Sequence, residues 1–134
     1  MNNAPLATAL REAAAKKGYA AIVAEEDRLA ALAPRFPAAL ITPPLLHSID
    51  GRRHGRARYD VLLRLLDDGA KLSQNDRNLR RQQLEADAIA IFTGLSNEEF
   101  VISVESLTVN HQPFATTTRG DVSVAAKARV LIWF

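Results

Sequence analysis

The sequence predicts a single α+β domain over residues 1–134, in which two hairpins flank a long helix and form one antiparallel sheet, with the N-terminal helix packed on one face. Residues 57–66 and 122–134 place apolar side chains at every second position, which is the period of a β-strand. Residues 73–95 place them three or four positions apart, which is the period of a helix. At 134 residues and 48% hydrophobic composition, the chain is large enough to bury one core.

The N-terminal part begins with a predicted helix over residues 5–17, ended by Gly18. Its apolar stripe consists of Leu6, Ala9, Leu10, Ala13 and Ala14. The next segment is ambiguous, because Tyr19–Val23 fits a short strand whereas Glu25–Ala33 has helical spacing. We favour a short helix there, ended by Pro34.

The first predicted hairpin starts with an apolar run at residues 38–50 that contains Pro43 and Pro44. Proline cannot donate a hydrogen bond to a sheet, so this run is predicted to be a bent or edge strand. Glycines at 51 and 55 indicate the hairpin connection. The following strand is predicted to turn one side to the core, namely Ala57, Tyr59, Val61, Leu63 and Leu65.

The long helix is predicted to begin at Ser73, because Asp76 three positions later completes a weak capping box. Its first half is polar, so only its second half is expected to pack deeply. The second hairpin then joins residues 100–110 to residues 122–134. The last strand is apolar on one side throughout and carries Ala125, Leu131 and Trp133 on the other, so we expect cover on both of its faces near its end.

No pattern in the sequence indicates catalysis. Cysteine is absent, and the three histidines, His47, His54 and His111, fall in or beside separate loops without the spacing of a helical metal pair. We therefore expect no catalytic, cofactor-binding or metal-binding residues and predict a protein that is not an enzyme. An enzymatic interpretation would require one of these histidines to lie near a carboxylate.

Arginines gather in two places, Arg52, Arg53, Arg56 and Arg58 in the first hairpin, and Arg77, Arg80 and Arg81 at the start of the long helix. Such clusters can bind phosphates, form salt bridges with a partner subunit, or simply face solvent. The net charge is only +2, so general affinity for nucleic acid is expected to be modest. No segment approaches the length of a membrane span, and we expect a protein made and used in soluble form, without a membrane partner.

The order of elements resembles that of the tail terminators and related head–tail connector (neck) or minor tail proteins of tailed bacteriophages. The segments that carry the resemblance are ARYDVLLRLLD at 57–67, LSQNDRNLRRQQLEADAIAIFTGL at 72–95 and PFATTTRGDVSVAAKARVLIWF at 113–134. The resemblance implies a structural subunit that assembles with itself into a ring, typically a hexamer, and docks on tail-tube or neck proteins. It also implies passive contact with DNA in the lumen and a place in the virion, after a stage in the cytoplasm of the bacterial host.

Residues expected at an interface or in the lumen of such a ring are Arg52, Arg53, Arg56, Arg58, Arg77, Arg80, Arg81, Leu131, Trp133 and Phe134. The alternative from another functional class is a small nucleic-acid-binding module that uses the Arg52–Arg58 and Arg77–Arg81 clusters.

Overall fold

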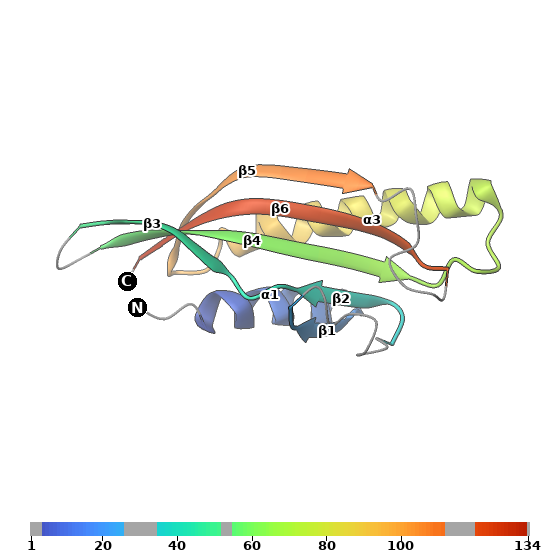
Figure 1. The fold of residues 1–134 in the computed structure, drawn as a ribbon, viewed down its shortest axis with the longest axis horizontal. Helices are drawn as coiled ribbons and strands as arrows, with labels where there is room; N and C mark the ends of the chain where they lie inside the picture. The colour runs from blue at the N-terminus through green and yellow to red at the C-terminus, as the bar shows by residue number, and fades with distance from the viewer. Residues whose placement is uncertain (1–3, 26–34, 52–54, 112–119, 134) are drawn as a thin grey trace.

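A computed structural model describes residues 4–25, 35–51, 55–111 and 120–133 (Figure 1). These residues form the predicted α+β fold, with two helices and a six-stranded sheet in the described ranges. The elements in chain order are α1 (Ala4–Lys16), β1 (Ala20–Val23), β2 (Ala38–Ile41), β3 (Leu45–Asp50), β4 (Arg56–Asp67), α3 (Gln74–Leu95), β5 (Val101–His111) and β6 (Val122–Trp133).

The two hairpins join into one sheet, as the sequence predicts. The strand order is β1-β2-β4-β6-β5, and β3 lies beside the first half of β4. Strands β4 and β6 pair along their whole length, from Arg56 opposite Trp133 to Asp67 opposite Val122. Every pairing is antiparallel except that of β1 with β2, which is parallel. Strand β6 is therefore central, with a hydrogen-bonded neighbour on each side.

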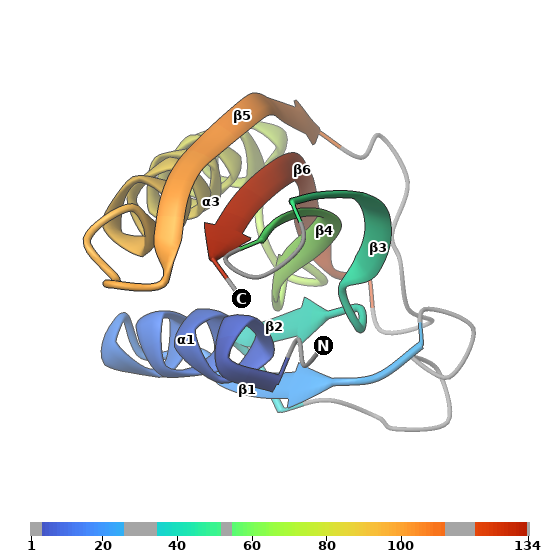
Figure 2. The same cartoon turned by 90° about the vertical axis from the view of Figure 1, so that its left-hand side faces the viewer.

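Both helices cover the same face of the sheet, and the sheet curves around them (Figure 2). The core lies between these layers, and the predicted inward side of β4 is buried there in full. Tyr19, in the link between α1 and β1, donates a hydrogen bond of 2.6 Å to Asp87 of α3, which ties this link to the long helix. One apolar layer between helices and sheet thus accounts for most of the burial.

The long helix α3 begins as the sequence predicts. The Ser73 hydroxyl accepts a hydrogen bond from the Asp76 backbone N–H, which satisfies one of the free donors of the first turn. Its buried residues all lie in the second half, namely Leu84, Ala88, Ile91, Phe92 and Leu95. Leu79 and Ile89 share the apolar spacing but are exposed, because the first turns extend past the end of the sheet (Figure 1) and Ile89 lies on the outer side of the helix.

Two predictions need correction. Residues 20–23 form strand β1 rather than part of a short helix, because parallel pairing with β2 satisfies their backbone groups. The helix expected over residues 25–33 lies outside the described residues, apart from Glu25, which is not helical. The apolar run with Pro43 and Pro44 is not one bent strand but two strands, since these prolines occupy the link between internal β2 and edge strand β3.

Candidate interaction surface at the free sheet edge

Strand β3 is the least covered strand of the sheet. It pairs only with β4, so its other backbone edge has no strand neighbour in the described part of the chain. Leu46 and Ile49 stand opposite Tyr59 and Ala57 of β4, which puts all four on the helix-covered face. Tyr59 and Ala57 are buried, whereas Leu46 and Ile49 each remain 49% exposed. The β3–β4 hairpin extends past the end of α1 (Figure 1), so β3 itself lies beyond the helical cover.

The opposite face of β3 is equally open. Leu45 is 68% exposed, the largest value among the exposed large apolar residues that the structure describes. Natural edge strands are usually protected by lysine, proline or inward-pointing charge, because an open edge can pair with another chain. Strand β3, with the sequence LLHSID, contains no lysine or proline, and its apolar side chains occupy both faces. We define Leu45, Leu46 and Ile49 as the β3 patch.

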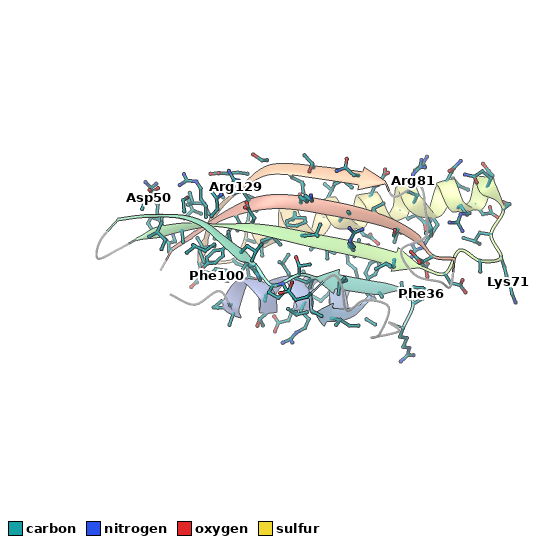
Figure 3. The ribbon with its side chains drawn as sticks, viewed as in Figure 1. Phe36, Asp50, Lys71, Arg81, Phe100 and Arg129 are labelled. Atoms are coloured by element: carbon teal, nitrogen blue, oxygen red, sulfur yellow. The ribbon has the colours of Figure 1, made fainter. Side chains whose placement is uncertain are left out.

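Charged side chains beside the β3 patch are already paired within the chain. Arg58 contacts Asp50 at 2.9 Å and Glu105 at 3.6 Å. Figure 3 shows Asp50 near the protruding end of the hairpin and Arg129 farther along the sheet. Arg129 contacts Asp60 at 3.0 Å. Of the first arginine cluster, Arg58 is thus neutralised locally.

Of the other members of the first arginine cluster, the structure describes Arg56. Arg56 is exposed at the start of β4. Arg52 and Arg53 lie outside the described residues, as does His54. The structure therefore brings Arg58 into an ion-pair network on the sheet and leaves Arg56 as an exposed cation of the same hairpin.

Arg77 of the second cluster holds the fold together rather than facing solvent as a free cation. Its Nη1 donates to the carbonyl oxygens of Gly69, at 2.7 Å, and Gly120, at 3.2 Å. Its Nη2 donates to the carbonyl oxygen of Asp121, at 3.3 Å. A Cβ atom at Gly69 would stand 2.5 Å from Nη1, so glycine is needed there for the guanidinium to fit. These bonds join the β4–α3 loop to the start of β6.

Arg80 and Arg81 are also engaged within the chain. Arg80 Nε lies 2.5 Å from Asp67 Oδ2 at the end of β4. Arg81 Nε lies 3.5 Å from Glu85 one helical turn along, a partly exposed pair that contributes little to stability. Neither guanidinium forms an open basic surface of the kind expected for phosphate binding.

At the end of β6, one apolar side chain is buried and another is exposed. Leu131 is 5% exposed, so the single chain already supplies the cover that the sequence led us to expect from a neighbour. Trp133 is 52% exposed and stands opposite Arg56, at the same end of the sheet as β3. Phe134 lies outside the described residues. Of the two described residues predicted here, Leu131 is buried and Trp133 is exposed.

Of the three histidines, His47 is the one whose side chain the structure describes. His47 Nδ1 lies 3.6 Å from Asp60 Oδ2, and both side chains are over 40% exposed. His111 ends β5, on the far side of β6 and β4 from β3. Residues 4–25, 35–51, 55–111 and 120–133 contain no group of three His, Cys, Asp or Glu side chains that could hold a metal ion. His47 therefore has the carboxylate neighbour that an enzymatic interpretation would require, in a solvent-exposed contact.

An open groove of about 590 Å³ crosses the sheet on the face opposite the helices. Its lining includes Leu45 at one end, Ser106 at the other, and Asp60, Lys127 and Arg129 between them. Ser106 has a φ of 56°, a left-handed conformation that is uncommon for serine, within a bulge of β5. No pattern in the sequence predicts this groove, because its lining comes from segments that are far apart in the chain and no motif joins them.

Comparisons with known protein families and with curated proteins find no match to this chain. No helix among the described residues has both the length and the apolar character that a membrane span requires. The most distinctive surface feature of the described residues is the β3 patch.

Proposed function

We propose that the chain is a structural subunit of a phage or prophage tail or neck, which assembles with itself into a ring that caps or joins the tail tube. The proposal involves no catalytic step and no cofactor. Its partners are further copies of the chain and the tail-tube or neck proteins on which the ring docks. The place in the virion is proposed because the order of elements resembles that of the phage tail terminators.

The observation that best supports assembly is the β3 patch on a free strand edge. Three large apolar side chains on six residues of edge strand cost solubility unless another surface covers them. Unpaired backbone N–H and C=O groups beside them can extend the sheet into a second chain. A subunit with a buried core of its own and an exposed apolar strand at one edge has the properties that self-assembly needs.

The nucleic-acid-binding alternative draws less support from the same structure. Arg58, Arg77 and Arg80 donate to acceptors within the chain, so binding phosphate would require them to give up those partners. Arg56 remains an exposed cation of the first cluster. Contact with DNA is therefore proposed only as passive contact inside a ring.

The proposal is tested first by the mass of the purified full-length chain. Multi-angle light scattering over a range of concentrations should give a multimer of defined size, and negative-stain electron microscopy should show rings. A chain that stays monomeric at every concentration, and that shifts duplex DNA in a salt-dependent manner, would instead support the nucleic-acid-binding module.

The proposed place in the virion is tested separately. Disrupting the coding sequence in a host that carries it on an inducible prophage should leave heads and tails that fail to join, or tails of abnormal length. Electron microscopy of the induced lysate measures the fraction of complete particles. An unchanged fraction would contradict a role in the tail or neck, even if the purified chain forms rings.

A further inference from the structure

The sheet has a longer free edge on the side opposite β1 and β3. Strand β5 pairs only with β6, and no other described strand pairs with its outer side. Strands β3, β4, β6 and β5 lie side by side in that order, and each is antiparallel to the next. Strands β3 and β5 consequently run in opposite directions. If a second copy is placed beside the first in the same orientation, its β3 lies antiparallel to β5 of the first copy. The alternating strand directions then continue from one copy to the next.

The rows of residues that lie opposite one another across the strands also continue from one copy to the next. Two apolar rows cross the helix-covered face, with Ile49, Ala57, Ile132 and Val101 in one and Leu46, Tyr59, Val130 and Val104 in the next. Without stagger between copies, Ile49 of one copy would lie beside Val101 of the next, and Leu46 beside Val104. Val104 is only partly buried against the core, so each copy would cover apolar surface that the other leaves open.

Only the first part of β5 compares with β3 in length, because β5 has 11 residues and β3 has six. The pairing of β5 with β6 shifts register between Glu105 and Thr108, where Ser106 has its left-handed conformation. This bulge separates Val101–Glu105 from the second half of β5. Strand β3 has six residues and lies at the same level of the sheet as Val101–Glu105. The stretch of β5 before the bulge therefore has the length that β3 needs.

We infer that β3 of one subunit adds as an antiparallel strand to residues 101–105 of β5 in the next copy, so that the sheet runs on from subunit to subunit. This inference rests on the proposed self-assembly and names its two surfaces. Because the surfaces differ, the contact is head-to-tail and generates a closed ring when the rotation between copies closes. Pairing of β3 with β3 across a two-fold axis would give only a dimer.

Ser48 and Ser103 provide the test, since both lie in one row of the sheet with Arg58 and Leu131 between them. Within a subunit they are three strand spacings apart, about 14 Å, which no disulfide can bridge. The chain has no cysteine of its own. The experiment compares Ser48→Cys, Ser103→Cys and the double variant, each as the full chain, after mild oxidation or with a short bis-maleimide, on denaturing gels.

The control is a double variant with the same number of cysteines, Ser48→Cys with Asn75→Cys, because Asn75 is exposed in the first turn of α3, and the first turns of α3 lie at the opposite end of the sheet from β3 (Figure 1). We expect the Ser48→Cys, Ser103→Cys double variant to give a ladder of covalent multimers. Each single variant and the control pair should give almost none. Light scattering before cross-linking reports whether each variant still assembles.

The possible outcomes separate this inference from the proposed function. Multimers that form by light scattering but give no ladder in the double variant would overturn the β3-to-β5 contact and leave self-assembly intact. Covalent dimers from Ser48→Cys alone would replace it with two-fold pairing of β3. A wild-type chain that is monomeric at every concentration would overturn both.

Discussion

Strands β6 and β3 are both apolar and both pair with β4, yet they occupy opposite extremes of the sheet. Strand β6 has a neighbour along each edge, and most of its residues are buried. Strand β3 has one neighbour, and Leu45, Leu46 and Ile49 are at least 49% exposed. The apolar side chains of β6 therefore stabilise the fold, whereas those of β3 are available for contact with another chain. Substitutions should separate the two roles.

The largest effect is expected from deleting residues 131–134. Leu131 and Ile132 are buried, and Ile132 pairs with Ala57 of β4 and Val101 of β5. Losing two buried aliphatic side chains and their backbone bonds should cost ~5 kcal/mol or more, which is comparable to the whole stability of a small domain. Circular dichroism and the soluble yield measure the outcome. A deleted chain that folds and assembles normally would refute the central role of β6.

A matched pair of threonine substitutions sharpens the comparison. Val130→Thr puts a hydroxyl at a position that is fully buried in the core and should cost about 2 kcal/mol of unfolding free energy. Ile49→Thr keeps a β-branched side chain at a half-exposed position and should change stability by less than about 0.5 kcal/mol. Only Ile49→Thr should weaken assembly without loss of folding. Urea denaturation and light scattering, run on both variants, measure the two effects, and equal effects on assembly at matched stability would contradict the distinction.

The anchoring of β6 can be tested at Arg77, whose guanidinium donates to carbonyl oxygens just before this strand. Arg77→Ala leaves those acceptors without their charged donor and should cost about 1.5 kcal/mol. Arg81→Ala is the control, since it removes a partly exposed pair from the same cluster and should cost less than about 0.5 kcal/mol. Thermal unfolding of both variants measures the difference. Equal, small losses would show that Arg77 is not a structural residue.

The smallest effect concerns Tyr19, which is buried in the core beneath β6. Burial, and next the hydrogen bond to Asp87, raise the pKa of Tyr19 well above its usual value. Unfolded tyrosine ionises near pH 10, so this stabilisation is fully present below about pH 10 and is lost as the pH rises toward the folded pKa. Tyr19→Phe should lose about 1 kcal/mol at pH 8 and show a smaller alkaline decline than the wild type.

Urea denaturation at pH 8 and pH 11 measures this contribution. The pKa of Tyr59 is also raised by burial, so Tyr59→Phe serves as a second variant. It removes the contribution of Tyr59 to the loss of stability at alkaline pH. Tyr19→Phe should not alter assembly below pH 10, since the Tyr19 hydroxyl bonds to Asp87 of α3 and not to a residue of the β3 patch. An alkaline decline that is identical in the wild type and Tyr19→Phe would contradict the assignment.

Much of the fold could be predicted because local patterns report local geometry. The alternation in β4 marks its buried side correctly, and Ser73 caps α3 as its spacing with Asp76 indicates. The parallel β1–β2 pair was missed, since four apolar residues fit a strand or a helix and only the position of β2 decides between them. For the arginines, sequence shows the clustering but not the acceptors, so Arg77 looked like a surface cation before its three carbonyl partners were known.

By itself, the sequence determined the strand and helix periods, the cap of α3, the place of the hairpins and the lack of a metal or nucleophile motif. Only the tertiary structure decided which apolar residues are covered. Leu131 and Ile49 look alike in a pattern, but Leu131 is 5% exposed within the sheet and Ile49 is 49% exposed at its edge. The physical reason is that periodicity assigns a side chain to a face, whereas its burial depends on how far neighbouring strands and helices extend over that face.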